Sequence, residues 1–535
     1  MLITTDSPNS NPSFITAKGE ENEPFKLFDY VLITYKEQQW IGQITKPNIN
    51  ISTSGLSPYD PTLLHGLERY QEDSEIQLID NVEMWEIKLL GEYNKAILST
   101  VRRRPKPGGT VVRLDRETTI NVLKLPKLIK HSDGSQNVIG KLMNAEDVPL
   151  CVDRKIFNHH IMVSGGTGSG KSNVGANLIT QAAKLGYCVF LYDAKPDYQK
   201  MNEANSEANS DPIQEIFNQF STYSLKSEGA KNLKKVCFYS GESKDYTSYN
   251  AVFGYKASDL DPYIFANLIL PDTASDLQRD EFISTFYTLQ RNSQSFELQK
   301  IKSSLEEKKR NSDKPAGSTI DAIIRAIDRK INAKELPWLD SVDTKISCAT
   351  GNPFSRSHGG QVVTFKPENL MEAGCIIHID CEGLTEANYA LFLSIFIREC
   401  QNYRNKNRSG IPVVQFIDEA HRVFDNASRY SDSLASVFNR AMREGRTLQH
   451  GVILSLQNSS QVPHLVVNNL NSHIVMKQNS REVAKFATQS MGEEFAVQTM
   501  NLGRGQALVK LFESNAVVLA QMTPSPFELQ RSDNQ

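Results

Sequence analysis

The feature that most constrains this chain is a glycine-rich loop between an apolar run and an amphipathic segment. Residues 165–172 read Gly-Gly-Thr-Gly-Ser-Gly-Lys-Ser and fit the pattern G-x-x-x-x-G-K-[ST] at every fixed position. The apolar run 161–163 predicts a short buried strand before the loop, and apolar residues at spacings of three and four predict a helix over 173–185. A strand, a glycine loop and a helix in this order predict a phosphate-binding loop in an α/β fold.

This loop brings several chemical groups to a polyphosphate. Its glycines let backbone N–H groups turn toward the phosphates, and the helix N-terminus adds a partial positive charge. Lys171 is predicted to reach the β- and γ-phosphates, and Ser172 is predicted to bind Mg²⁺. The candidate nucleotide-binding residues are Gly165, Gly166, Thr167, Gly168, Ser169, Gly170, Lys171, Ser172 and Asn173.

Carboxylates follow two other strand-like runs. Residues 412–421 read Pro-Val-Val-Gln-Phe-Ile-Asp-Glu-Ala-His, which predicts a buried strand that ends in two adjacent acids. Asp418 suits the Mg²⁺ shell, and Glu419 suits the activation of the attacking water. We expect this acid pair and the glycine loop to meet across neighbouring strands around one magnesium-bound triphosphate. Asp193 ends a further apolar run, where it can take part in chemistry or cap a turn.

The letters Asp-Glu-Ala-His at 418–421 also occur in helicases built from two tandem RecA-like lobes. Those enzymes place the acids within one lobe's length of the phosphate-binding loop, and they need a complete second lobe afterwards. Here a charged stretch with helical spacing, over about 256–336, separates the loop from the acids, and too few residues follow them for a second lobe. We therefore expect one ATPase core that carries an insertion.

Further candidates for catalysis follow the acid pair. The apolar run 451–456 predicts a strand, and Gln457 after it can sense the γ-phosphate, hold the water or merely cap a loop. The helix predicted over 436–446 carries Arg446, our first candidate for an arginine finger that reaches a neighbouring subunit's nucleotide, and Arg443, our second. Ordinary surface ion pairs are the alternative role for both arginines.

Changes in pattern along the chain divide it into segments. Short β-rich runs with turn residues between them predict a small N-terminal β-barrel, and charged helical spacing without strand signals predicts a helical insertion. The predicted segments are a mobile tail (1–24), a β-barrel (25–130), the first part of the ATPase core (131–255), the helical insertion (256–345), the second part of the core (346–522) and a C-terminal tail (523–535).

The amino-acid composition limits which binding partners and which cellular compartment we expect for this chain. The 59 basic and 62 acidic residues nearly balance, which argues against a generic basic coat, although a ring can confine positive charge to a narrow channel. The basic run 102–107 suits a solvated loop or a nucleic-acid contact. The 7 cysteines form no C-x-x-C pair and mostly lie in apolar runs, as in reduced proteins. With no signal peptide and no apolar run of spanning length, we expect a cytoplasmic protein.

The chain resembles the HerA family of ring-forming ATPases, within the HerA/FtsK branch of P-loop proteins. The resemblance spans most of 25–522 and implies a RecA-like core, an N-terminal barrel of the HAS-barrel type and a helical insertion. Two stretches depart from the family pattern, namely 194–198 and the polar residues 458–460 after Gln457. The residues that carry the resemblance are 139–142, 164–172, 191–193, 416–421, 443–446, 454–457 and 501–509.

The resemblance also implies a function. It implies a homohexamer that uses ATP and Mg²⁺ to thread double-stranded DNA through its pore, with Lys171, Asp418, Glu419, Gln457 and Arg446 in the roles given above. Family members usually act with a partner encoded nearby, either the nuclease NurA in DNA-end processing or a nuclease or sirtuin-type NADase effector in bacterial antiphage defence. The alternative is an ATP-regulated scaffold that assembles and activates an effector enzyme with little DNA translocation. A secretion-type ATPase of the conjugation branch is disfavoured because the sequence shows no membrane anchor.

Overall fold

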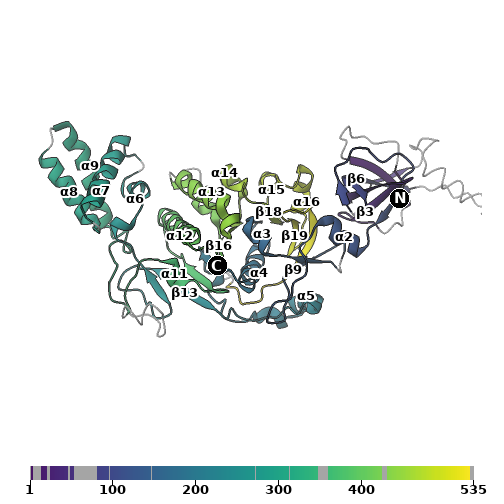
Figure 1. The fold of residues 1–535 in the computed structure, drawn as a ribbon, viewed down its shortest axis with the longest axis horizontal. Coiled ribbons are helices and arrows are strands. Elements are labelled where there is room, and N and C mark those ends of the chain that lie inside the picture. Colours follow the sequence, from purple (N-terminus) through teal and green to yellow (C-terminus); the bar gives the residue numbers. More distant parts are fainter. Residues whose placement is uncertain are drawn as a thin grey trace, which may run out of the picture.

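The computed structural model describes most of the chain as a barrel, a central sheet with its helices, and a helical bundle. The barrel and the bundle lie at opposite ends of the central part (Figure 1). The α/β class, the large core sheet and the N-terminal β-region predicted from the sequence are confirmed. The described residues are 2–3, 14–20, 25–45, 49–52, 81–95, 97–145, 148–271, 273–293, 295–311, 314–346, 360–424 and 430–530.

The N-terminal sheet is antiparallel and closes on itself. Its strands are β1 (Leu2–Ile3), β2 (Phe14–Glu20), β3 (Tyr30–Tyr35), β4 (Gln38–Ile44), β5 (Ile49–Ser52), β6 (Asn81–Asn94), β7 (Ile97–Ser99) and β8 (Thr110–Arg113). Their order is β2-β1-β8-β3-β4-β6-β5, and the ring closes because β2 also pairs with β6. Alternate side chains point inward, so Val31, Ile33, Trp40 and Ile87 share one buried cluster.

Two of these strands lie where the sequence predicted a mobile tail. β2 runs antiparallel to β6 over its whole length, and β1 pairs with β2. Ile15 and Ala17 are buried in the barrel, so the tail prediction was wrong for this stretch. The apolar alternation of β2 is short and polar residues surround it, so local pattern did not predict a strand. Its pairing partner β6 lies far along the chain. Residues 1, 4–13 and 21–24 of the predicted tail lie outside the described residues.

The central sheet places the glycine loop near its middle. Its strands are β9 (Val138–Leu142), β10 (Pro149–Cys151), β11 (Ile161–Ser164), β12 (Cys188–Asp193), β13 (Leu233–Phe238), β14 (Ala251–Phe253), β15 (Ile376–Asp380), β16 (Val413–Ile417), β17 (His450–Leu456), β18 (Ser472–Met476), β19 (Gln506–Lys510) and β20 (Val518–Met522). Their order is β10-β9-β20-β19-β18-β11-β17-β16-β12-β15-β13-β14. The strands from β18 to β14 are parallel, and the remaining four pair antiparallel beyond β18. Their shared carboxyl-end edge is where α/β sheets bind ligands.

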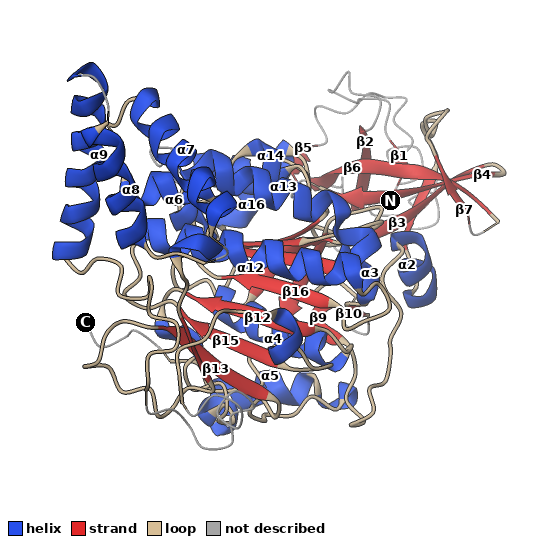
Figure 2. Ribbon diagram, turned by 60° about the vertical axis from the view of Figure 1, so that its left-hand side comes forward, coloured by secondary structure: helices blue, strands red, loops and turns tan. Residues whose placement is uncertain are grey.

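Helices cover both faces of this sheet. The described α-helices outside the bundle are α2 (Arg116–Leu123), α3 (Arg154–Asn158), α4 (Lys171–Lys184), α5 (Asp211–Gln219), α11 (Pro367–Leu370), α12 (Glu386–Lys406), α13 (Tyr430–Leu448), α14 (His464–Val467), α15 (Arg481–Ala487) and α16 (Ala496–Met500), of which α4 and α12 illustrate the two faces. In β12, Phe190 and Tyr192 share a cluster with residues of α12 and α13, whereas Val189 and Leu191 pack with α4. Figure 2 shows α4 and α12 on opposite sides of the strands. Burial on both faces explains the continuous apolar runs of these strands.

A helical bundle stands where the sequence predicted an insertion. Its helices are α6 (Pro262–Ile269), α7 (Asp276–Asn292), α8 (Leu298–Arg310) and α9 (Lys314–Asn332). Phe265 packs edge-on against Phe282 and Phe286, so aromatic side chains form much of its interior. After the bundle, Val363 forms a parallel bridge with Phe253 of β14, and the chain then adds strand β15, which pairs with β12 and β13.

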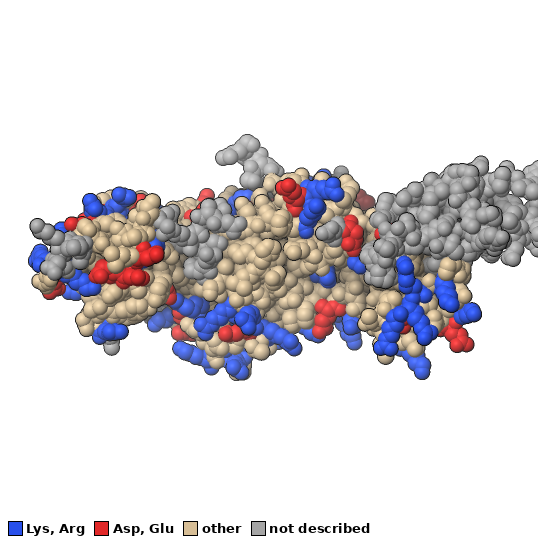
Figure 3. Space-filling model, turned by 90° about the horizontal axis from the view of Figure 1, so that it is seen from above, with Lys and Arg blue, Asp and Glu red and all other residues tan. Residues whose placement is uncertain are grey.

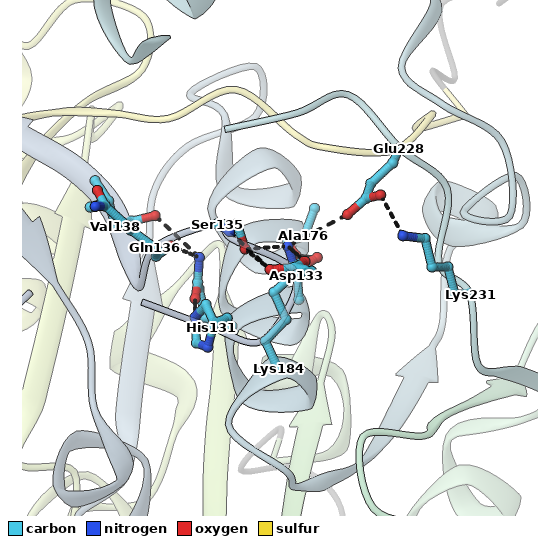
Figure 4. Close-up of polar contacts among 11 residues, drawn as sticks. His131, Asp133, Ser135, Gln136, Val138, Ala176, Lys184, Glu228 and Lys231 are labelled. Atoms are coloured by element: carbon cyan, nitrogen blue, oxygen red, sulfur yellow. Dashed lines mark hydrogen bonds and ion pairs between the residues drawn. The ribbon is translucent and has the colours of Figure 1, made fainter. Parts of the chain in front are cut away.

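The carboxyl end of α4 is fixed by polar contacts to residues shortly before β9 and shortly before β13. Lys184 lies 3.0 Å from Asp133 and 3.5 Å from Glu228, and it donates a hydrogen bond to Ser135 (Figure 4). Burial raises the pKa of Asp133, but hydrogen bonds from Ser135 and Lys184 outweigh burial and hold that pKa well below its ordinary value. These contacts position the helix whose amino end carries the glycine loop.

Neither disulfides nor membrane spans occur in the described part of the chain. Its cysteines are all buried and free, and Cys348 lies outside the described residues. Among the described helices, none is both long and apolar enough to cross a membrane.

Buried histidines at the amino-terminal edge of the core sheet predict sensitivity to acid. Burial lowers the pKa of His160 to about 4, of His450 to about 3 and of His473 to about 4. In the unfolded chain a histidine has a pKa of about 6.5. Below that pH the unfolded chain binds protons that the folded protein does not, so each histidine lowers the free energy of unfolding by about 1.4 kcal/mol per pH unit down to its folded pKa.

Urea unfolding at about pH 7.5 and about pH 5.5 measures this loss of stability. Replacing His450 with glutamine should reduce the difference between the two conditions, because a glutamine oxygen can still accept the hydrogen bond from Gln415 and does not titrate. His464→Gln is the matched control, since His464 is exposed. An equal pH dependence in wild type and the His450 variant would contradict the explanation.

Candidate active site

The glycine loop connects β11 to α4, and its backbone requires glycine. Gly168 and Gly170 have φ angles of 75° and 105°, in the left-handed region that side chains disfavour. A Cβ atom on Gly166 would lie 2.4 Å from Oδ1 of Asn479. The loop therefore keeps its shape only with glycine at these positions, as a phosphate cradle does.

Two side chains at the start of α4 are placed for phosphate and metal. Lys171 is buried, and its Nζ donates to the backbone oxygen of Gly166 at 3.2 Å. Burial lowers the pKa of Lys171, although the charges of Glu419 and Asp418 oppose this effect. The Ser172 hydroxyl donates to Oδ2 of Asp197 at 2.8 Å. A bound polyphosphate would add the negative charge that this buried lysine favours.

The two acids follow β16 directly, and both are buried. Burial, followed by the nearby charge of Glu419, raises the pKa of Asp418 to about 8. Glu419 has a φ of 49° and a ψ of 39°, a left-handed conformation that is strained for a residue with a side chain. Such strain is typical of functional sites, and the turn it makes starts the short 3₁₀ helix Ala420–Val423.

The residues around Asp418 suit a magnesium ion. Mg²⁺ takes oxygen ligands and usually keeps several waters beside one or two carboxylates. Ser172 and Asp418 line the same cavity, as does the Asp197 carboxylate that contacts the Ser172 hydroxyl. A divalent cation would also relieve the repulsion between Asp418 and Glu419, which together with burial holds Asp418 toward its neutral form.

One strand separates the glycine loop from the acids, contrary to the expectation of neighbouring strands. β17 pairs with β11 on one side and with β16 on the other, and Gln457 follows its end. Nε2 of Gln457 donates to Oε1 of Glu419 at 2.6 Å, and its Oε1 accepts a long hydrogen bond of 3.5 Å from Thr167. The amide thus bridges the glycine loop and the acid pair.

Most of the candidate residues surround one cavity of about 570 Å³. The cavity is lined by Thr167, Gly168, Gly170, Lys171, Ser172, Asn173, Asp418, Glu419 and Gln457. Gly165, Gly166 and Ser169 shape the loop without lining the cavity. The glycine loop and the acids are therefore close enough to share one nucleotide.

The candidate finger residues lie elsewhere. Arg443 and Arg446 are exposed on α13, do not line the cavity, and have no ion pair with a described residue. Arg440, one turn earlier, lies 3.6 Å from Glu444. Neither Arg443 nor Arg446 serves the cavity of its own subunit.

Asp193 takes the turn-capping role that the sequence left open. Its Oδ2 accepts a hydrogen bond from the backbone N–H of Tyr198 and lies 2.8 Å from Nε2 of His378. It is buried and does not line the cavity. Asp193 therefore holds the turn that follows β12.

The sequence analysis missed several residues at the site, of which Lys195 and Asp197 lie in that turn and His421 and Arg504 lie elsewhere in the chain. Lys195 lines the cavity, and its Nζ lies 3.2 Å from Oε1 of Glu419. His421 lies 3.4 Å from the other oxygen of Glu419, and Asp197 contacts Ser172. Arg504 also lines the cavity. The available signal was the charged Lys-Pro-Asp run just past a buried strand end, where loops carry chemistry.

A family model matches part of this chain, and two known proteins resemble it in sequence over most of its length. The family model described as the central domain of helicase HerA matches residues 137–372. The DNA double-strand break repair helicase HerA of Saccharolobus solfataricus is 23% identical over 511 residues, covering 93% of this chain and 88% of that protein. The protein of the same description from Sulfurisphaera tokodaii is 21% identical over 489 residues, covering 90% and 85%.

Two further likenesses are partial. The probable helicase MJ1565 of Methanocaldococcus jannaschii is 28% identical over 181 residues, and the match spans 32% of each protein. Among solved structures, VirB4 of Thermoanaerobacter pseudethanolicus aligns with 74% of this chain and 99% of its own, at 11% identity and a TM-score of 0.47.

Proposed function

Because the chain belongs to the HerA family of P-loop ATPases, we propose that it hydrolyses ATP with Mg²⁺ to move double-stranded DNA through a ring of identical subunits. The observation that carries the proposal is the single cavity that joins the glycine loop to the acid pair. The likeness to an archaeal DNA repair helicase over 93% of the chain supports the DNA substrate.

Hydrolysis assigns a distinct task to each group around the cavity. The glycine loop and Lys171 hold the β- and γ-phosphates, while Ser172 and Asp418 are the residues that would hold Mg²⁺, which supplies positive charge to the phosphates. Glu419 accepts a proton from the attacking water, and the oxygen of that water forms a bond to the γ-phosphorus. The bond from that phosphorus to the bridging oxygen breaks, and ADP and inorganic phosphate leave. Gln457 positions Glu419 through their hydrogen bond.

Arg504 lines the cavity within its own chain, and a ring would add a second arginine from a neighbouring subunit. Phosphoryl transfer is accelerated strongly by an arginine that stabilises the transition-state charge. Arg443 and Arg446 are exposed on α13 and away from the cavity of their own chain. A head-to-tail interface that closes into a ring, which we propose to be a hexamer, gives each site one arginine from its neighbour.

The distribution of surface charge supports binding inside a channel rather than on an outer face. Lys and Arg side chains on the face in Figure 3 lie in separate groups, with acidic side chains among them. The formal net charge of the chain is −3. A ring concentrates the few basic groups of each subunit around one axis, where duplex DNA can meet several of them at once.

Stimulation by DNA tests the motor. We expect double-stranded DNA to raise ATP turnover severalfold, and we expect the stimulation to fall steeply between about 50 mM and about 200 mM salt because phosphate contacts release counterions. Turnover is measured with linear duplex and without DNA, and Lys171→Ala serves as the inactive control. ATP turnover that is unchanged by duplex DNA at low salt would contradict the proposal that the protein moves DNA.

We also propose that an effector enzyme of the nuclease or NADase class acts with the ring, in DNA-end processing or antiphage defence. The barrel supports this, because none of its described residues lines the cavity and its Ile97 and Val112 side chains are exposed. Co-purification with the products of adjacent genes tests the partner. A stoichiometric complex whose ATP turnover is unchanged by DNA would favour the alternative function. In that alternative the chain is a scaffold that assembles and activates the effector.

A further inference from the structure

The ATP cavity has a second half that is not formed by the glycine loop or the acids. It is lined by residues 205–207 and by Ser525 and residues 527–530. We propose that residues 523–530, here called the C-terminal strap, form the nucleoside-binding wall of the site, and that Glu528 binds a ribose hydroxyl. This inference rests on the proposed ATP-binding function and adds which part of the chain recognises the nucleoside.

The strap is fixed across the first turns of α4. It leaves the sheet after β20, and the Asn177 side chain of α4 donates to the backbone oxygens of Thr523 and Pro524 at 2.9 and 3.0 Å. The backbone N–H of Ser525 donates to Oδ1 of Asn173, which follows the glycine loop directly. The strap is thus held beside the loop that binds the phosphates.

A second set of contacts joins the strap to the segment 203–207. Phe527 forms an antiparallel bridge with Ala204 and is almost fully buried, with its ring against Tyr198. The Asn205 side chain donates to the backbone oxygen of Ser525 at 2.8 Å. Two segments far apart in the sequence therefore form one continuous wall.

The chemistry of this wall suits a nucleoside rather than a phosphate. Glu207, Glu528, Asn205 and Gln530 line the cavity. Carboxylates repel phosphates but accept hydrogen bonds from sugar hydroxyls, and a carboxylate that binds the ribose is a known feature of nucleotide sites. The backbone N–H of Ser206 donates to Oε2 of Glu528 at 2.6 Å, which holds this carboxylate in place before any ligand binds.

The arrangement of the phosphate end determines where the nucleoside lies. The γ-phosphate belongs beside Glu419 and Gln457, and the loop and Lys171 hold the phosphates behind it. The nucleoside must then extend into the remaining space, which the strap and residues 205–207 enclose. The strap is also tied to the catalytic end, because the backbone N–H of Gln530 donates to the backbone oxygen of Asp197 at 2.9 Å.

Binding of ATP and of tripolyphosphate separates the two halves of the cavity. Calorimetry with Mg²⁺ should show Glu528→Ala binding ATP about tenfold more weakly, because the lost hydrogen bond involves a charged group. Tripolyphosphate, which lacks the nucleoside, should bind the variant within about twofold of wild type. Glu215→Ala is the matched control, since Glu215 is an exposed carboxylate on α5 that does not line the cavity.

Deoxy analogues then test the ribose contact itself. Wild type should discriminate against 2′-deoxy-ATP or 3′-deoxy-ATP, and Glu528→Ala should lose that discrimination. Glu528→Gln, which keeps an acceptor for Ser206, should fall between wild type and the alanine variant. The inference is wrong if Glu528→Ala binds ATP as wild type does, or if ATP and tripolyphosphate weaken equally. A wild-type protein that binds neither ligand would instead refute the proposed ATPase function.

Discussion

Replacing Glu419 with glutamine is expected to abolish ATP turnover while leaving ATP binding intact. Glutamine has the same shape, so the loop and Lys171 keep their places around the cavity. Its amide cannot take the proton from the attacking water, and the loss of a general base costs about 100- to 10,000-fold in rate. Oε1 of Glu419 accepts the hydrogen bond from Gln457, and the glutamine oxygen can still do so.

Turnover by phosphate release and binding by calorimetry measure the two properties separately. Glu382→Gln is a suitable control, because Glu382 lies just beyond the end of β15, two strands from β16, and does not line the cavity. The Glu419 variant should saturate with ATP at concentrations close to those of wild type. Retention of a tenth or more of the wild-type turnover would show that another group activates the water.

Local pattern was enough to predict the elements that carry the phosphate-binding loop and the acids. Apolar spacing predicted a helix over 173–185, and the structure has α4 at Lys171–Lys184. The run before Asp418 predicted the strand that the structure has as β16, Val413–Ile417. The helix is buried along one stripe and gives a periodic apolar pattern, and the strand is buried on both faces and gives a continuous apolar run, so both signals depend little on distant residues.

Long-range pairing was beyond the reach of local pattern. No periodicity shows that β17 stands between the glycine loop and the acids, yet this order is what lets Gln457 contact both. The tail predicted over 523–535 begins with a strap whose bonds go mainly to α4 and to segment 203–207. A polar segment that is ordered only by distant partners resembles a free tail in sequence.

Lys195 illustrates a related failure at the site itself. Its ion pair with Glu419 joins turns that follow two adjacent strands, β12 and β16, which are separated in sequence by the helical bundle. The residue type and the strand-end position were visible in the sequence, but its partner was not. Strand order therefore had to be known before this lysine could be placed beside the catalytic acid.

Replacing Arg446 with alanine is expected to leave ATP binding unchanged and to reduce hydrolysis by about 1,000-fold or more, the usual contribution of an arginine finger. Arg446 is exposed on α13 and outside its own cavity, so its loss leaves the nucleotide-binding groups of the same subunit in place. Arg440→Ala is the matched control on the same helix, because Arg440 already pairs with Glu444. Arg443→Ala tests the second candidate in the same assay.

Mixed rings show whether the arginine acts on a neighbour. A subunit with Arg446→Ala keeps its own acids, and a subunit with Glu419→Gln keeps its finger, so each inactive variant supplies what the other lacks. Mixing them should restore turnover in sites where an intact Glu419 meets an intact Arg446 from the adjacent chain. If Arg446→Ala alone hydrolyses ATP at the wild-type rate, the finger is not Arg446. If Arg446→Ala is inactive and mixing restores no turnover, Arg446 acts within its own subunit or supports the fold of that subunit. The main physical argument for a ring would then be refuted.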